Sequence, residues 1–170
     1  MPSFDPMNIR PAMTSDFPEV LALNEGSVQF LSPLTRSRLA EIHSEAAMHV
    51  VVEHDGNVAA FLVALREHAA YDSINFQWFE QRYDRYLYVD RIVVGQALQG
   101  QGTGSLLYKL VFQAARQAAV PFVTCEFDID PPNPISEKFH RRFGFQEVGR
   151  QAVAGGMKMV SLQLARVDGE

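Results

Sequence analysis

The hydrophobic pattern at the start of the chain predicts one short strand followed by two helices. Residues 9–12 form an extended segment. Helix-start side chains at positions 14–16 precede an apolar run with helical spacing that ends at Leu23. A polar loop follows, and Thr35 then caps a second helix that continues to about Ala47.

A hairpin is predicted next along the chain. Residues 49–53 and 58–65 are rich in strand-forming side chains, and Asp55-Gly56-Asn57 between them suits the positive φ angles of a tight turn. Residues 66–85 are polar and aromatic, and they are too many for an ordinary hairpin connection. We expect this segment to be either a lid or a packed surface loop.

The second half of the chain alternates strands with helices. Residues 86–94 predict a strand, residues 99–104 a glycine-rich turn, and residues 107–118 a helix with apolar side chains at helical spacing. A further strand is predicted at residues 122–127, after Pro121.

The chain closes with a helix and two strands. Residues 135–143 predict a helix that ends at Gly144, and residues 145–153 and 158–164 predict strands joined by a turn with two glycines. No internal repeat or interdomain linker interrupts the pattern. We therefore expect a single α/β domain that spans residues 1–170.

Composition agrees with one globular domain of 170 residues. Hydrophobic residues make up 47% of the chain and charged residues 21%, which is typical of a packed protein. The net charge of −5 argues against a general role on nucleic acid, because a phosphate backbone would require clustered Lys and Arg. The acidity weakly favours a cationic or neutral substrate.

Cysteine usage and hydropathy indicate a cytoplasmic protein without a membrane partner. Cys125 is the only cysteine, which excludes an intrachain disulfide and a multi-cysteine zinc site. It lies in a β-rich run, where we expect a small buried filler, and we expect no metal. The N-terminus lacks the pattern of a secretory signal, and the longest apolar stretch, residues 58–65, is too short to span a bilayer.

The glycine-rich turn is the strongest chemical signal in the sequence. Alternating glycines between a strand and a helix allow several backbone N–H groups to converge on an anion, which makes a pyrophosphate cradle. A tight turn without a ligand is the alternative. The spacing excludes two other phosphate motifs, because Gly104 is not followed by Lys and the preceding strands do not form a βαβ unit.

The turn and four other segments resemble the GNAT superfamily of acyl-CoA-dependent N-acyltransferases. Gln99, Gly102 and Gly104 match the family's Gln/Arg-x-x-Gly-x-Gly/Ala pattern. Residues 9–12 resemble its first strand and residues 88–94 its fourth strand. Asn133 and residues 140–145 are similar to its last motif. The resemblance implies a central, mostly antiparallel, splayed sheet of about seven strands flanked by about four helices.

The resemblance also implies where acetyl-CoA binds. The pantetheine arm would pair with the backbone of Ile92, Val93 and Val94, and Asn133 and Ser136 would contact the pantetheine or support the strand-to-helix loop. A purely structural turn role for Asn133 is an equal alternative. Besides Gln99, the diphosphate would be held by Gly100, Gln101, Gly102, Thr103, Gly104 and Ser105. Gln96 departs from the usual Pro, and Gln99 from the more frequent Arg, but neither change removes the backbone amides.

Catalytic residues follow less directly from the sequence. The family's usual proton donor is a Tyr, and its position is occupied by His140, which either protonates the departing thiolate or only packs against CoA. Asp90 interrupts an apolar strand as a candidate base, although an ion pair with Arg91 or Arg85 is the more ordinary role for it. Glu126 is a second carboxylate that could act as the base in place of Asp90.

Three functions remain open at this point. The first is transfer of an acetyl group to the amine of a small molecule or peptide, with Glu25, Trp78 and Glu126 near the acceptor. Trp78 and its aromatic neighbours could instead seal a surface loop. The second function is a non-catalytic acyl-CoA-binding or regulatory module, and the third is nucleotide binding. The sequence is also compatible with a homodimer.

Overall fold

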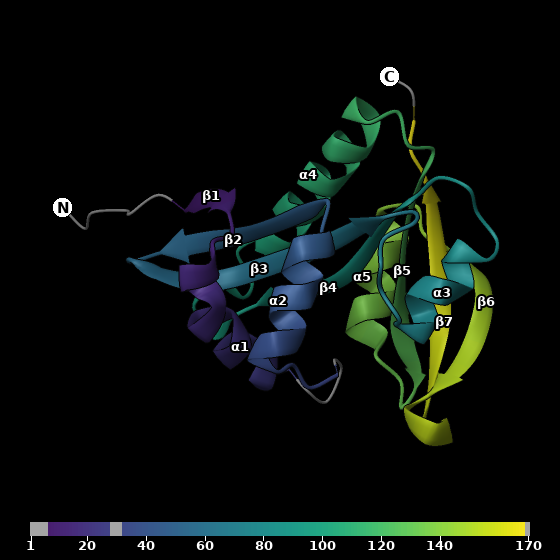
Figure 1. Cartoon of the computed structure of the whole chain (residues 1–170), viewed down its shortest axis with the longest axis horizontal. Coiled ribbons are helices and arrows are strands. Elements are labelled where there is room, and N and C mark those ends of the chain that lie inside the picture. The colour runs from purple at the N-terminus through teal and green to yellow at the C-terminus, as the bar shows by residue number, and fades with distance from the viewer. Residues whose placement is uncertain (1–6, 28–31, 169–170) are drawn as a thin grey trace. The chain divides into compact units, whose positions relative to one another are not determined.

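The computed structural model describes residues 7–27 and 32–168. Its described part contains seven strands, in the sheet order β1-β2-β3-β4-β5-β7-β6, and five α-helices (Figure 1). The pairs β1–β2, β2–β3, β5–β7 and β6–β7 are antiparallel, and the pair β4–β5 is parallel. The predicted class, a mostly antiparallel seven-stranded α/β fold, is confirmed.

The chain divides into two compact units, which are described one at a time. Unit 1 consists of Met1–Leu65 and Asp90–Lys109, and unit 2 consists of Arg66–Val89 and Leu110–Glu170. Three elements contribute residues to both units: strand β3 (Asn57–Arg66), through its last residue Arg66, strand β4 (Leu87–Val94) and helix α4 (Thr103–Gln117).

Unit 1 contains the first three strands and two helices. Its elements are β1 (Asn8–Pro11), a 3-10 turn (Thr14–Asp16), α1 (Phe17–Glu25), α2 (Arg36–Glu45), β2 (Met48–His54) and β3 (Asn57–Arg66). The Thr35 side chain accepts a hydrogen bond from the Arg38 N–H at 3.2 Å, which confirms the predicted start of α2. In Figure 1, α1 and α2 lie side by side in front of β2 and β3.

The hairpin of unit 1 forms as the sequence predicts. Asp55 and Gly56 have φ angles of 52° and 77°, the left-handed pair that a two-residue hairpin turn requires. Every residue from Val58 to Leu65 is at most 7% exposed. A strand buried on both faces explains why this run is continuously apolar instead of alternating.

Unit 2 is built around three antiparallel strands with a helix on each face. Its elements are α3 (Ile74–Glu80), β5 (Phe122–Asp130), α5 (Pro134–Arg142), β6 (Gln146–Val153), a 3-10 turn (Ala154–Gly156) and β7 (Lys158–Arg166). Glu126 hydrogen-bonds to a residue of α3, whereas its neighbour Phe127 contacts α5. Since successive strand residues point to opposite faces, α3 and α5 cover opposite sides of the sheet.

The segment at 66–85 differs from the loop that the pattern predicts, because it contains helix α3. Ser73 caps this helix by accepting a hydrogen bond from the Phe76 N–H, and Phe76 and Phe79 are completely buried. The segment is therefore packed, which agrees with one of the two expectations for it. Aromatic residues have low helix propensity, which explains why the helix is not visible in the pattern.

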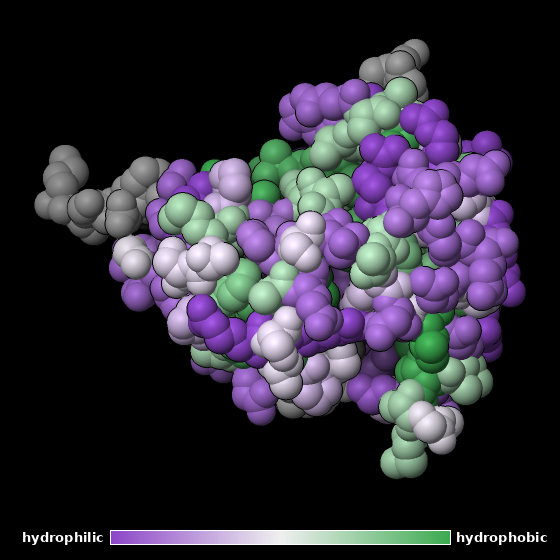
Figure 2. Space-filling view, viewed as in Figure 1, coloured by the Kyte–Doolittle hydropathy of each residue, from purple (hydrophilic) through white to green (hydrophobic). Residues whose placement is uncertain are grey.

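The turn between β6 and β7 is uncharged and exposed. It spans residues 154–157, and the Met157 side chain is 81% exposed. In Figure 2 this turn stands out at the lower right in pale green and white, below a small hydrophobic patch.

Candidate functional site

The glycine-rich turn of unit 1 has the backbone geometry that its sequence predicts. It connects β4 to α4 through a short 3-10 turn, Gln96–Leu98. Gly100 and Gly102 both have a φ of 77°, and a Cβ atom placed on either would meet no other atom within 4 Å. These glycines are needed for their backbone conformation, and the space beside them is open.

The start of α4 supplies backbone donors next to these glycines. The Leu106 N–H donates to the Gly102 carbonyl at 3.0 Å and is the first N–H of the helix's own ladder. The N–H groups of Thr103, Gly104 and Ser105 precede it, as at the start of any α-helix. Together with the positive end of the helix dipole, they form an anion-binding turn that fits a diphosphate.

Gly95, the residue directly after β4, makes a close contact with strand β3. The Gly95 N–H donates to the Ala59 carbonyl at 2.8 Å, and a Cβ on Gly95 would lie 2.8 Å from that same oxygen. Sequence reasoning missed Gly95, whose only signal is a glycine directly after a strand. The Gln99 side chain turns back and donates to the Val94 carbonyl at 3.4 Å.

Asp90 forms an ion pair with Arg91, which is the more ordinary of the two roles considered for it. Its carboxylate accepts a hydrogen bond from the Arg91 Nε at 2.9 Å, and both side chains are 5% exposed. Arg91 also donates to the Asn24 side chain at 3.1 Å and to the Ser32 carbonyl at 3.0 Å. The Asp90 carboxylate is thus held by a buried ion pair within unit 1.

The Arg91 contacts involve residues that sequence reasoning missed. Asn24 is 1% exposed at the end of α1, and its amide donates to the Ser32 carbonyl at 3.2 Å. The available signal was an arginine inside an apolar strand. Glu25, the candidate acceptor residue, is the last residue of α1 and is exposed.

Helix α5 of unit 2 brings together three of the predicted residues. Asn133 caps the helix, and its side-chain oxygen accepts a hydrogen bond from the Ser136 N–H at 3.3 Å. Ser136 in turn lies one helical turn before His140, with its hydroxyl 3.2 Å from the His140 Nδ1. The structural role weighed for Asn133 is therefore present, and its Nδ2 takes no part in that cap.

The proton of the His140 ring has a defined position. Its Nδ1 lies 2.7 Å from the Ser136 carbonyl oxygen, which can only accept, so Nδ1 carries the hydrogen. Burial lowers the pKa of His140, while the hydrogen bond to the Ser136 backbone opposes that shift. The neutral ring therefore has its unprotonated nitrogen at Nε2. In this tautomer the ring must first take up a proton at Nε2 before that nitrogen can protonate a thiolate.

Glu126 on β5 sits beside neutral donors. Its two carboxylate oxygens accept hydrogen bonds from the Tyr88 hydroxyl at 2.7 Å and from the Asn75 amide at 3.2 Å. The Gln151 amide donates to Asn75 at 3.0 Å and extends the network to β6. The partner of Asp90 is a positively charged guanidinium. The hydroxyl and the amide that donate to Glu126 are uncharged.

Asp128 is a second carboxylate on the same face of β5, and sequence reasoning missed it. It is 7% exposed, and the Lys158 ammonium lies 3.4 Å from it. Burial raises the pKa of Asp128, although Lys158 opposes the shift. Its signal in the sequence was alternation with Glu126 along the strand.

Trp78 packs within unit 2. The Arg82 guanidinium stacks over its ring at 4.1 Å, and a Cβ on Gly149 of β6 would lie 2.3 Å from the indole. Glycine at 149 thus leaves the room that this ring occupies. Phe76 and Tyr71, two aromatic neighbours of Trp78 in the sequence, are buried in the core.

Among residues 7–27 and 32–168, no three His, Cys, Asp or Glu side chains are grouped so that they could hold a metal ion. None of the helices described there is long and apolar enough to cross a membrane.

Most of the sequence matches a known protein family. The model of the family described as "Acetyltransferase (GNAT) family" matches residues 13–145. No curated protein sequence matches the chain significantly.

Solved structures share the fold at low sequence identity. Ard1 from Thermoplasma volcanium is 17% identical with a TM-score of 0.74, over 95% of this chain and 98% of that one. The ribosomal-protein-S18-alanine N-acetyltransferase from Escherichia coli is 15% identical with a TM-score of 0.72, over 96% and 95%. The structure of yncA from Salmonella typhimurium with its cofactor acetyl-CoA is 16% identical with a TM-score of 0.72, over 98% and 96%.

Proposed function

The chain belongs to the acetyltransferase (GNAT) family, and from this premise we propose that it transfers an acetyl group from acetyl-CoA to an amine. The family model runs through segments of both units, which supports one acetyltransferase domain over residues 1–170. The similar fold solved with acetyl-CoA supports the choice of acyl donor.

One observation carries the proposal: the open turn with Gly100 and Gly102 at the start of α4. Two left-handed glycines and the free N–H groups of a helix's first turn suit a diphosphate, the anionic part of CoA. The backbone of Ile92, Val93 and Val94 would pair with the pantetheine arm. In this arrangement CoA supplies a thioester whose carbonyl carbon an amine can attack.

His140 has a proposed role as a proton carrier. The attacking amine must lose one proton and the departing thiolate must gain one, so the reaction is balanced if one group moves that proton. The neutral His140 ring, with its hydrogen fixed on Nδ1, can accept at Nε2 and then donate from the same atom. Its lowered pKa supports this role, because the ring is neutral before the reaction starts.

The carboxylates then divide into structural and acceptor-binding groups. Asp90 is paired with Arg91, so we assign it to stabilising β4 and not to proton transfer. Glu126 and the exposed Glu25 are proposed to attract the ammonium form of the acceptor. Trp78 is proposed to contribute apolar contact, since α3 carries it on the Glu126 side of β5.

The acceptor is proposed to be a small-molecule amine or a peptide, in the cytoplasm. The E. coli neighbour is named for an alanine of a ribosomal protein, which keeps a peptide N-terminus among the candidates. A homodimer is also proposed. The uncharged turn with Met157 and the position of β6 at the end of the strand order support it.

A non-catalytic acyl-CoA-binding module is the second candidate function. It is favoured by one observation, the burial of His140 with its ring hydrogen committed to a backbone carbonyl. Such a histidine can also serve only to pack α5 against the sheet.

Release of free CoA thiol separates these two functions. The protein is incubated with acetyl-CoA and three acceptors: a polyamine, free L-amino acids, and a short peptide with an unblocked N-terminus. We expect thiol release above the rate without acceptor for at least one of them. Binding of acetyl-CoA by calorimetry with no thiol release for any acceptor would instead support the binding module.

A further inference from the structure

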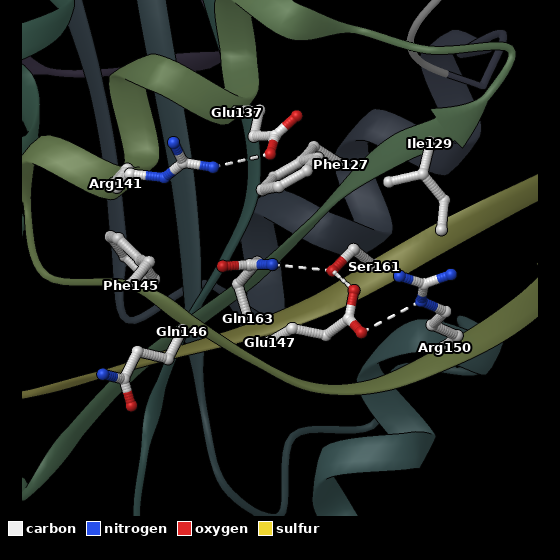
Figure 3. A pocket seen from close by; sticks show the side chains of 10 residues that line it. All are labelled: Phe127, Ile129, Glu137, Arg141, Phe145, Gln146, Glu147, Arg150, Ser161 and Gln163. Carbon is white, nitrogen blue, oxygen red and sulfur yellow. Dashed lines mark hydrogen bonds and ion pairs between the residues drawn. The ribbon is translucent and has the colours of Figure 1, made fainter.

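Unit 2 contains a polar cavity of about 410 Å³ that plays no part in the proposed reaction (Figure 3). Strand β7 contributes Ser161 and Gln163 to it, and helix α5 contributes Glu137 and Arg141. Its size lies within the usual range for small-molecule sites. The cavity lies on the α5 side of the sheet, because Ser161 is in register with Phe127.

The floor of this cavity is a chain of hydrogen bonds. The Gln163 amide nitrogen donates to the Ser161 hydroxyl at 2.6 Å, and Ser161 donates to Glu147 at 2.6 Å. The Arg150 Nε donates to the other oxygen of Glu147 at 2.9 Å. Ser161 and Arg150 hold the pKa of Glu147 below its usual value, so this carboxylate stays ionised.

This chain of bonds leaves one acceptor of a buried residue without a partner. Gln163 is 6% exposed, and its side-chain oxygen has no hydrogen bond to any residue in the described part of the chain. In Figure 3 that oxygen points away from Ser161, on the side of Phe145. An amide oxygen at the edge of a cavity can accept a hydrogen bond from a donor of a bound ligand.

The charged groups at the rim are balanced and only partly used. Arg141 donates to one oxygen of Glu137 at 2.7 Å, while Arg150 uses only its Nε toward Glu147. Two guanidinium groups thus retain donors, and Glu137 retains an acceptor oxygen. A simple anion would face two carboxylates here, and a simple cation would face two arginines. A ligand that carries both charges matches the rim.

The cavity is also lined by Gln146 and by three apolar residues, Phe127, Ile129 and Phe145. We propose that this cavity binds a free α-amino acid with an apolar side chain. Its carboxylate would meet the arginine donors, its ammonium group would meet Glu137 and the Gln163 oxygen, and its side chain would contact the apolar residues.

The same cavity is in contact with the surroundings of His140. Phe127 and Phe145 lie with their ring centroids 5.4 and 5.3 Å from that of His140. An occupant that presses on these two rings changes the packing of the histidine. This second step rests on the proposed function, and through it the amino acid regulates turnover.

Calorimetry with L-leucine tests the binding step without any need for turnover. We expect a saturable signal with a dissociation constant of about 1 mM or tighter. L-leucinamide, which lacks the carboxylate charge, and 4-methylpentanoate, which lacks the ammonium group, are expected to bind at least about tenfold more weakly. No saturable signal from L-leucine, or equal affinity for all three compounds, would overturn the proposal.

Matched variants place the ligand in this cavity. Arg150→Gln removes exposed donors at the rim and is expected to weaken L-leucine binding about tenfold or more. Gln163→Leu removes the amide acceptor and is expected to do the same, whereas Arg166→Gln, an exposed arginine at the end of β7 outside the lining, leaves binding unchanged. Binding unaffected by Arg150→Gln and Gln163→Leu would place L-leucine elsewhere, as an acceptor amine for example, and overturn the proposal.

Acetyl-CoA turnover measured with and without L-leucine then tests the regulatory step. We expect a change of at least about twofold in kcat at saturating acetyl-CoA, and the change should disappear in Arg150→Gln. If L-leucine binds and kcat stays constant, the regulation is wrong. If no acceptor supports turnover, the proposed function fails while the binding result still stands.

Discussion

Each unit of the molecule buries one histidine, and the two differ in what holds the ring. His49 on β2 of unit 1 is 8% exposed, and His140 on α5 of unit 2 is 5% exposed. Burial is the main cause that lowers the pKa of both, to about 4 for His49. Burial and a shifted pKa are therefore not enough to distinguish a catalytic histidine from a structural one.

The hydrogen bonds distinguish them. The His49 Nδ1 lies 2.8 Å from the Nδ1 of His43, so either ring can be the donor, and its Nε2 is buried without a hydrogen-bond partner among the described residues. The His140 Nδ1 is tied to the Ser136 carbonyl of its own helix, which fixes the ring hydrogen. A fixed tautomer on a capped helix is suited to directed proton transfer, whereas His49 fills a core position beside Phe61.

The largest expected effect is on turnover when each histidine is replaced by Phe. His140→Phe should lower kcat by about 10² to 10⁴-fold, because it removes the proposed proton carrier from a position whose aromatic surroundings accept a phenyl ring. His49→Phe is the matched control and should leave kcat within about threefold, since it lies outside the proposed site. Steady-state kinetics with saturating acetyl-CoA measure both. Equal losses of kcat in the two variants would contradict the distinction.

The second effect is on stability, and His49 dominates it. Because the pKa of His49 is about 4 in the folded state and ordinarily 6.5, the folded state binds fewer protons than the unfolded state between these values. Its stabilising contribution is complete above about pH 6.5 and is lost as the pH falls toward 4, by about 3 kcal/mol in total.

Urea unfolding of wild type and His49→Phe at pH 7 and pH 5 isolates this contribution. We expect the difference in unfolding free energy between the two proteins to shift by about 2 kcal/mol in favour of the variant at pH 5. Asp16, held ionised by Arg10, opposes the shift at His49 and is present in both proteins. A difference that does not depend on pH would show that His49 titrates normally.

The third effect is the pH dependence of turnover that His140 imposes. If the neutral ring accepts a proton at Nε2, kcat should rise with pH through a pKa below 6.5 and then stay level, because burial lowers that pKa. The profile is measured with acceptor and acetyl-CoA saturating. A kcat that instead falls as the pH rises past this pKa would assign His140 the role of a protonated acid.

The smallest effect is expected for Ser136→Ala. The ring of His140 is held by the Ser136 carbonyl, which this substitution keeps, while the hydroxyl at 3.2 Å is removed. We expect kcat to fall less than about fivefold. A loss as large as that of His140→Phe would show that the hydroxyl, and not the backbone, positions the ring.

Features made by the backbone could be predicted from the sequence. The hairpin at Asp55 and Gly56, the cap at Thr35 and the glycine turn at Gly100 and Gly102 each depend on a local conformation that few residue types adopt. Local chemistry was enough to locate them, and with them most of the strands and helices.

Features made by side chains from distant segments could not be predicted in this way. Arg91 meets Asn24 and Ser32 only after β4 is placed, and Ser161 meets Glu147 only after β6 pairs with β7. The tautomer of His140 needed one distance, from Nδ1 to a carbonyl. Helix α3 was missed because packing of its aromatic residues outweighs their low helix propensity.

The proposed function depends on binding of CoA to the turn at Gly102, and a pair of glycine variants tests this binding most directly. Gly102 and Gly56 share a φ of 77°, and a Cβ added at either would meet open space, so Gly→Ala imposes the same backbone strain at both. In calorimetry with CoA we expect Gly102→Ala to weaken binding at least about tenfold and Gly56→Ala to leave it unchanged. Equal affinity of both variants and wild type, or no binding of CoA by the wild type, would contradict it.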